Sequence, residues 1–270
     1  MRRCALKFTV LLKQTPDTAE LPKITPEQAL AGNQGVTKVV NPWDEYAVEE
    51  GIRLKERFGG ETVAMSMGPD EVDEALKSAL AMGCDRAVRL WDESFEGSDV
   101  WGTALVLAKG VEKDGGADVI LTGKMSVDGN SGAVAHGVAC KLGVSLLTQV
   151  AKIVDISDGM ITVERLLDEG RETVRAPLPA VVSVVKEINE PRYPTFIRIR
   201  KASRAKIPVL TAADLGLSPD QVGAAAAKVK WTELVKPPAK KREVVIIEGE
   251  TPEEKARKLL DYLMNVEKVI

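Results

Sequence analysis

An alternation of short apolar segments with helix-like segments runs through the first half of the chain and constrains the fold most strongly. Each apolar segment has strand length and is followed, after a turn, by a segment with helical periodicity or helix-capping residues. The expected strands are Phe8–Leu12, Glu61–Met67, Arg86–Leu90 and Asp118–Gly123, and the expected helices cover 42–58, 71–82, 99–113 and 133–142. This order predicts an α/β fold with a parallel sheet and helices on both faces, which Ser145–Val150 extends.

The carboxyl edge of this sheet is the expected ligand site, because open parallel sheets bind ligands there. Three segments should face that edge: the loop after the first strand, the turn Met67-Gly68-Pro69 and the turn Asp128–Gly132. The last turn separates a strand from a helix, so backbone N–H groups at the helix start can face an anion. Gly129 and Gly132 let the backbone approach a phosphate closely. Taken alone, this turn also fits an ordinary loop with a Ser or Asn cap.

Asn41 and Asp44 stand at the start of the helix expected over 42–58. Asn41 suits the N-cap, Pro42 suits the first helical position, and Asp44 favours a helix N-terminus. The two polar side chains could also bind an adenine or a ribose, although capping alone explains them.

The second half of the chain changes character after Val150. Ser157-Asp158-Gly159 is a hairpin signal between 151–156 and 160–167, and strands are expected over 171–176 and 180–185. We therefore expect an antiparallel appendage on a domain that spans 1–207. Residues 208–270, with a strand at Val244–Ile247 and a helix at 252–263, are expected to form an extended C-terminal arm that embraces a partner.

Residues 187–201 carry candidate partner contacts. Pro191 and Pro194 interrupt regular structure, and a basic helix is expected from Ile199. Phe196 and Ile197 are apolar residues within an otherwise polar loop. Exposed apolar residues on a rigid loop often mark a binding surface, and local packing is the alternative.

Charge and composition exclude several classes of function. The net charge of −3 disfavours a nucleic-acid binder, and no apolar run reaches membrane-spanning length. The apolar stretch near the N-terminus is too short for a signal peptide, so we expect a cytoplasmic protein. A single histidine, His136, argues against a multi-histidine metal site or a Ser-His-Asp hydrolase. The widely spaced Cys4, Cys84 and Cys140 are expected to be buried thiols.

Several segments together resemble the β subunit of electron transfer flavoprotein. The match follows the chain in order over nearly its whole length, and its most specific part is Asn189-Glu190-Pro191-Arg192-Tyr193-Pro194-Thr195. The other segments that carry it are 10–13, 40–50, 66–69, 79–83, 121–124 and 178–182. The resemblance implies a fold of the adenine-nucleotide alpha-hydrolase-like type and a nucleotide-binding role for domain 1–207.

The resemblance also implies a heterodimer with an α subunit that holds FAD. In simple electron carriers of this family the β subunit holds a structural AMP, whereas in electron-bifurcating members it holds a second FAD that accepts a hydride from NADH. By position, the nucleotide contacts would be Leu11, Asn41, Asp44, Met67, Gly123, Asp128, Gly129, Asn130, Ser131, Gly132, Ala133 and Val134.

The turn after residue 127 bears on the choice between the two nucleotides. AMP-type members resemble D-D-D-x-N-Q-T-G, and bifurcating members resemble D-G-D-T-A-Q-V-G. Residues 128–135, D-G-N-S-G-A-V-A, align with the second pattern without a gap. They depart from it at Asn130, at Gly132-Ala133 and, just beyond, at His136. Fewer acids also lower the negative charge where a pyrophosphate must lie, so the turn favours FAD and electron bifurcation.

The resemblance assigns partner contacts as well. The family's partner-recognition loop falls on 187–201, with Asn189, Glu190, Pro191, Arg192 and Tyr193 in it and Phe196 as its apolar anchor. Glu172 matches a position that contacts the α subunit, on which the arm 208–270 would pack. The expected electron partners are dehydrogenases or quinone-reducing proteins, and NADH in the bifurcating case. Any membrane association would be peripheral, through those partners.

Two other functions share the same fold. A stand-alone adenine-nucleotide sensor would need neither the loop 187–201 nor the arm. An ATP-cleaving enzyme would carry a Ser-Gly-Gly-rich loop after the first strand, whereas Lys13–Asp17 contains no glycine.

Overall fold

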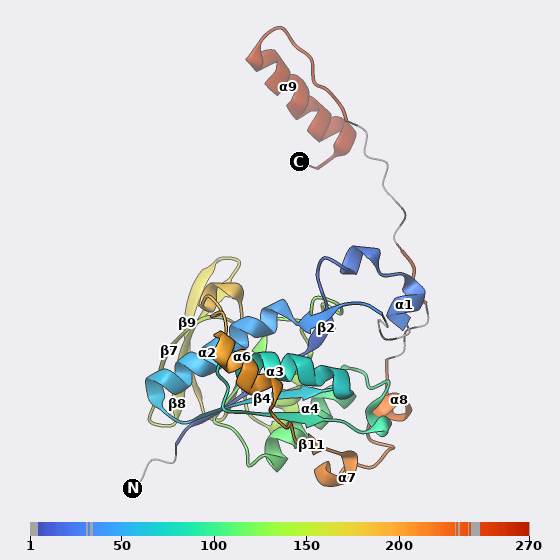
Figure 1. Ribbon diagram of the computed structural model, residues 1–270. Coiled ribbons are helices and arrows are strands. Elements are labelled where there is room, and N and C mark those ends of the chain that lie inside the picture. The colour runs from blue at the N-terminus through green and yellow to red at the C-terminus, as the bar shows by residue number, and fades with distance from the viewer. Residues whose placement is uncertain are drawn as a thin grey trace. The chain divides into compact units, whose positions relative to one another are not determined.

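The computed structural model describes residues 5–30, 32, 35–229, 231, 233–236, 238 and 244–269. The chain divides into two compact units, Met1–Leu234 and Val235–Ile270. The first unit is built on one large sheet with helices on both faces (Figure 1).

Nine strands form the large sheet in the order β11-β5-β4-β1-β6-β10-β7-β8-β9, and two more form a small antiparallel pair. The strands are β1 (Lys7–Leu11), β2 (Gln14–Pro16), β3 (Lys38–Val40), β4 (Glu61–Met67), β5 (Arg86–Leu90), β6 (Val119–Gly123), β7 (Ser145–Ser157), β8 (Met160–Leu167), β9 (Gly170–Pro177), β10 (Ala180–Val184) and β11 (Val209–Leu210).

Helices connect and cover these strands. The α-helices are α1 (Pro26–Leu30), α2 (Pro42–Phe58), α3 (Asp73–Met82), α4 (Val100–Lys113), α5 (Val134–Leu142), α6 (Phe196–Ser203), α7 (Ala212–Leu215), α8 (Gly223–Ala226) and α9 (Pro252–Tyr262). The 3₁₀ turns are η1 (Leu21–Lys23), η2 (Asp70–Val72), η3 (Glu93–Phe95) and η4 (Lys186–Ile188), and η5 (Leu263–Glu267) is a π-helical turn.

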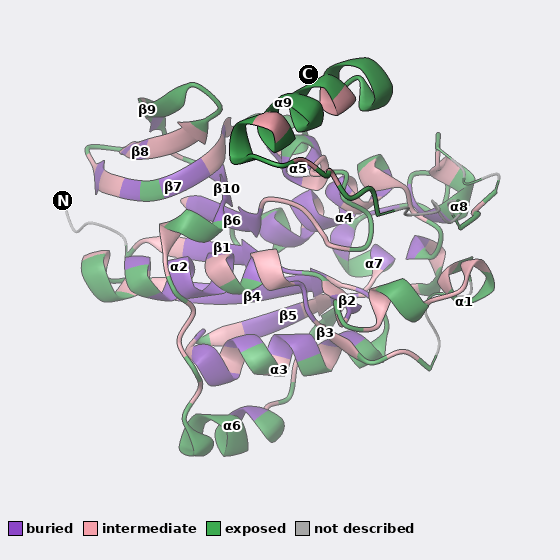
Figure 2. Cartoon of the chain, turned by 90° about the horizontal axis from the view of Figure 1, so that it is seen from above, coloured by how far each residue is buried: buried purple, intermediate pink, exposed green. Residues whose placement is uncertain are grey.

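Two hydrophobic cores lie on opposite faces of the sheet, because neighbouring strand residues point to opposite sides. On β1, Val10 packs into the core covered by α2 and α3, whereas Leu11 packs into the core beneath α4 and α5. Figure 2 shows the central strands almost wholly buried and helix α6 largely exposed. The buried sheet gives a rigid base whose carboxyl edge carries the loops of the candidate site.

The predicted parallel core is confirmed. β1 pairs in parallel with β4 and β6, and β4 pairs in parallel with β5. Helix α2 and strands β4 and β5 have the predicted bounds. In α2 this reflects Pro42 at the first helical position and Gly59 with φ of 74° just beyond the end.

The division between parallel core and appendage differs from the prediction. Strand β10, assigned to the appendage, lies inside the parallel core between β6 and β7, because all five of its residues are buried. Strand β7 continues unbroken from the core into the hairpin, with Gln149 at a φ of 58° where the register shifts. The antiparallel strands β8 and β9 are therefore an extension of the same sheet.

Two local predictions were wrong. Gln14–Pro16, expected to be loop, pairs with β3 as strand β2. The basic helix begins at Phe196 rather than Ile199, because Thr195 caps it by accepting a hydrogen bond from the Arg198 N–H. Phe196 and Ile197 therefore lie in the first turn of helix α6.

The C-terminal region also differs in part. β11 pairs with β5, and Leu215, Leu217 and Val222 pack into the core, so residues 209–222 lie on the sheet unit. The expected strand Val244–Ile247 is absent in the described residues and this segment is non-regular. In the second unit, α9 buries no residue and exposes Leu259 and Leu260.

The cysteines show a mixed outcome. Cys84 is buried as expected, whereas Cys140 is exposed on helix α5, and Cys4 lies outside the described residues. No helix in the described part of the chain has the length and apolar character to cross a membrane.

Candidate functional site

Side chains at the start of helix α2 form hydrogen bonds to the segments at the carboxyl edge of the sheet. Both carboxylate oxygens of Asp44 accept backbone hydrogen bonds, Oδ2 from Lys13 N at 2.8 Å and Oδ1 from Gly123 N at 3.0 Å. Lys13 follows β1 and Gly123 ends β6, so one side chain joins the ends of two neighbouring strands.

Asn41 fastens the loop that leads into the turn 128–132. Its Nδ2 donates to the Met125 carbonyl at 2.9 Å, and its Oδ1 accepts from Val127 N at 3.1 Å. Its backbone N–H also donates to the carbonyl of Lys13 at 2.9 Å. Asn41 and Asp44 thus hold the frame of the site, and their contact with a nucleotide stays a prediction.

Asp44 is almost fully buried, at 6% exposure. Burial raises its pKa from 3.8 to about 7, against the lowering effect of hydrogen bonds from Lys13, Asn41 and Gly123. The frame therefore contains a carboxyl group that changes charge near neutral pH.

The turn 128–132 and the start of helix α5 form an open backbone cradle. Asn130 and Gly132 have positive φ angles of 50° and 61°, which asparagine and glycine tolerate best. Ala133 is the N-cap of α5 and has no side chain to bond the first helical N–H groups. Ser131 Oγ accepts only a long 3.4 Å contact from Ala133 N. The first N–H groups of α5 are thus available to an anion.

The three segments predicted to share one crevice contribute to a common cavity, the turn 128–132 through Asp128 alone. It has a volume of about 220 Å³, and its lining includes Lys13, Gln14, Lys38, Met67, Glu71 and Asp128. Met67 and Asp128 are the predicted nucleotide contacts that line it, whereas Leu11 is buried in the core beneath α4 and α5.

An ion pair that sequence reasoning missed crosses this cavity. Lys13 Nζ lies 2.7 Å from Asp128 Oδ2 and 2.9 Å from Oδ1. Burial acts to raise the pKa of Asp128, but the charge and hydrogen bond of Lys13, with hydrogen bonds from Ser126 and Gly129, outweigh it and lower that pKa. The only signal in the sequence was the position of Lys13, directly after a strand that ends at the carboxyl edge.

These residues fit a phosphate-bearing ligand. The turn and the start of helix α5 offer backbone donors, and Lys13 offers a cation. The cavity is smaller than the roughly 300–1,000 Å³ of typical small-molecule pockets. It therefore has room for part of a dinucleotide and not for the whole.

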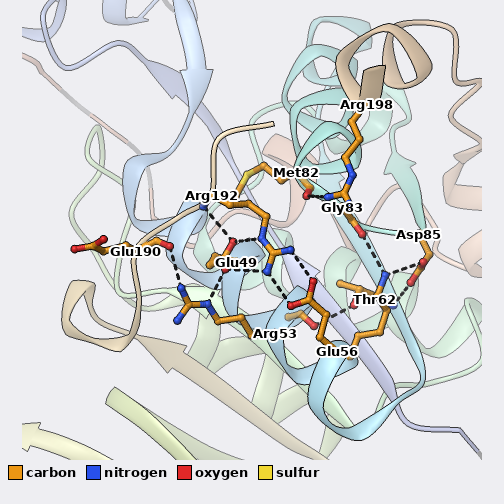
Figure 3. Close-up of polar contacts among 12 residues, drawn as sticks. Glu49, Arg53, Glu56, Thr62, Met82, Gly83, Asp85, Glu190, Arg192 and Arg198 are labelled. Carbon is orange, nitrogen blue, oxygen red and sulfur yellow. Dashed lines mark hydrogen bonds and ion pairs between the residues drawn. The ribbon is translucent and has the colours of Figure 1, made fainter. Parts of the chain in front are cut away.

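The loop before helix α6 is clamped onto helix α2 by an ionic network (Figure 3). Arg192 contacts Glu49 Oε2 through Nε at 2.8 Å and Glu56 Oε1 through Nη1 at 2.6 Å. Burial acts to raise the pKa of Glu49, but hydrogen bonds from Arg192 and Arg53 outweigh it and lower that pKa. The Glu49 side chain is only 2% exposed, so the network holds a buried charge.

The predicted partner-binding residues divide into two groups. Asn189 Nδ2 donates to Glu50 Oε2 at 3.0 Å, and the Glu190 carbonyl accepts from Arg53, so these residues and Arg192 face α2. Tyr193 and Phe196 point outward, with exposures of 96% and 79%. The loop therefore turns Asn189, Glu190 and Arg192 toward α2 and presents exposed aromatic side chains on its outer side.

Glu172 lies apart from that loop, on the edge strand β9. It pairs with Arg165 of β8 at 3.1 Å, and its side chain remains about half exposed. It is accessible to a partner chain.

Comparison with known proteins gives consistent matches. The electron transfer flavoprotein domain family matches residues 31–215. The electron transfer flavoprotein subunit β of Mycobacterium tuberculosis is 38% identical over 249 residues, 90% of this chain and 93% of that protein. That of Thermoanaerobacterium thermosaccharolyticum is 36% identical over 226 residues, 83% of this chain and 86% of the relative. Subunit CarD of the caffeyl-CoA reductase-Etf complex of Acetobacterium woodii is 36% identical over 236 residues, 87% and 89% of the two chains.

Proposed function

The chain belongs to the electron transfer flavoprotein family, as a β subunit, and from this premise we propose that it forms a heterodimer with an α subunit and binds FAD at the carboxyl edge of its sheet. The observation that carries the nucleotide site is the meeting of three segments around one cavity, with Asp128 in its lining as the first residue of the turn that precedes the uncapped helix α5. The proposed contacts are Leu11, Asn41, Asp44, Met67 and residues 123–134.

FAD is proposed in preference to AMP because of the turn 128–132. Gly129 and Asn130 replace acids of the AMP-type pattern, so Asp128 is the turn's one carboxylate. A turn with little net negative charge favours a pyrophosphate. A non-bifurcating carrier with structural AMP is the alternative.

The proposed activity is electron bifurcation within a larger complex. A flavin in the β site would supply two-electron and one-electron redox chemistry, with NADH as hydride donor, and the residues of this chain bind and orient it. The name of CarD states that this relative belongs to a complex of a reductase with an Etf. By analogy, the partners proposed here are dehydrogenases or reductases that exchange electrons with the flavoprotein.

Two surfaces are proposed for protein partners. Tyr193, Phe196 and Ile197 form the surface for the redox partner, because the clamp of Arg192 on α2 leaves them exposed. The α subunit is proposed to cover Glu172 and the part of the arm 208–270 that lies beyond residue 222. Helix α9 supports this, since it exposes apolar residues without burying any in its own unit.

Anaerobic titration of the purified heterodimer with NADH tests the redox proposal. The flavin of the complex should lose its oxidised absorbance while NADH becomes NAD⁺, without any dehydrogenase present. A complex that NADH leaves oxidised, but that a dehydrogenase partner reduces, would be the simple carrier.

A further inference from the structure

The cavity at the carboxyl edge contains two lysines, and each is neutralised by a carboxylate from another element. Lys13 pairs with Asp128, and Lys38 of β3 pairs with Glu71 of η2 at 2.6 Å. The cavity is therefore electrically balanced without a ligand, and a phosphate that enters it must compete with a carboxylate for a lysine.

Lys13 combines a fixed backbone with a side chain that is free to move. Its N–H donates to Asp44, and its carbonyl accepts from the N–H of Asn41. The side chain beyond is 52% exposed, forms its ion pair with Asp128, and also acts electrostatically on the Asp44 carboxyl. An ammonium group on a flexible stem can exchange one anionic partner for another without disturbing the strand.

Asp128 is the first residue of the turn that leads to the uncapped start of helix α5. The Lys13 ammonium group is thus held at the first residue of the turn 128–132. Lys38 sits on the small β2–β3 sheet and contacts Glu71 rather than this turn. Of the two lysines, Lys13 is the one positioned to share an anion with the turn.

We propose that Lys13 binds a phosphoryl oxygen of the nucleotide and that Asp128 is the intramolecular competitor that occupies Lys13 in the free site. This inference rests on the proposed nucleotide-binding function. Asp128 then weakens nucleotide binding by occupying Lys13. From its position in the turn alone, Asp128 would instead be expected to contact the nucleotide.

Substitutions of the two residues should shift affinity in opposite directions. Asp128→Asn frees Lys13 and should tighten ADP binding about threefold, as expected for removal of a partly exposed ion pair. Lys13→Met should weaken ADP binding about tenfold, because a charge-assisted contact to the phosphate is lost. The double variant should match Lys13→Met, because the proposed effect of Asp128 on affinity requires the Lys13 ammonium group.

Isothermal titration of the purified α–β complex, depleted of bound nucleotide, measures these shifts directly. ADP is the probe, and adenosine, which lacks phosphate, should bind all variants equally. Lys77→Met removes a lysine that pairs with Glu74 on helix α3, outside the cavity lining, and controls for net charge. Lys13→Arg keeps the cation and should restore most of the affinity, which separates lost charge from misfolding.

The inference is overturned if ADP binds the wild-type complex but Asp128→Asn weakens it, or if Lys13→Met leaves it unchanged. If the purified complex releases AMP rather than FAD, the proposed FAD preference fails while the role of Lys13 stands. A wild-type complex that binds no ADP would refute both the proposed nucleotide site and the role of Lys13.

Discussion

Replacement of Asp44 by asparagine should change how the stability of the protein depends on pH. Asp44 is buried at the junction of β1, β6 and α2, and its carboxylate accepts hydrogen bonds from the backbone of Lys13 and Gly123. Burial nevertheless dominates and raises its pKa from 3.8 to about 7. Asparagine has nearly the same shape but does not titrate.

The direction in which stability changes with pH follows from whether the folded or the unfolded protein holds the proton. Between the unfolded pKa of 3.8 and the folded pKa of about 7, the folded protein holds a proton that the unfolded chain has lost. This contribution to stability is therefore present at acidic pH and is lost as pH rises through the folded pKa. With 1.36 kcal/mol per pKa unit, the wild-type advantage over Asp44→Asn should be about 2.5 kcal/mol larger near pH 5 than near pH 8.

Urea unfolding of the full chain, followed by tryptophan fluorescence at several pH values, measures this difference. The contributions of the other titrating groups to the free energy of unfolding cancel between wild type and variant. The hydrogen bond that asparagine loses lowers the stability of the variant by the same amount at every pH. Asp158→Asn, in the β7–β8 turn, serves as the charge-matched control. A difference that stays flat, or that grows as pH rises, would show that the two backbone hydrogen bonds outweigh burial and would refute the reasoning.

Two further outcomes concern the partner-binding loop. Arg192→Met leaves the buried Glu49 with Arg53 as its remaining cation and should lower the free energy of unfolding, measured in urea, by about 2 kcal/mol. Glu56→Gln, at the exposed end of the network, should lower it by less. Equal losses for the two variants would contradict the role of burial. Phe196→Ala should slow electron transfer to a redox partner in stopped-flow measurements. Flavin content should stay constant, because the Phe196 side chain is exposed and not part of the core. Loss of flavin would instead identify Phe196 as a packing residue.

The elements that could be predicted from sequence are those specified by nearby residues. Helix α2 carries its own boundaries in Pro42 and Gly59, and the apolar runs of β4 and β5 identify buried strands without reference to the rest of the chain. The shared edge of Met67 and Asp128 followed from the rule that parallel strands end together.

The features that escaped prediction depend on residues far apart in the sequence. Strand β10 joins the parallel core because it pairs with β6, about sixty positions earlier, and its own apolar run did not identify that neighbour. Lys13 and Asp128 are 115 positions apart, and Arg192 and Glu49 are 143 positions apart. Charged side chains suit many partners, so such pairs become visible only once the backbone brings them together.

The nucleotide content of the purified heterodimer tests the central claim most directly. Nucleotides released by denaturation and quantified by mass spectrometry should include two FAD per heterodimer, one of them from the site formed by Asn41, Asp44 and the turn 128–132. One FAD together with one AMP would contradict this account and identify the protein as a simple electron carrier.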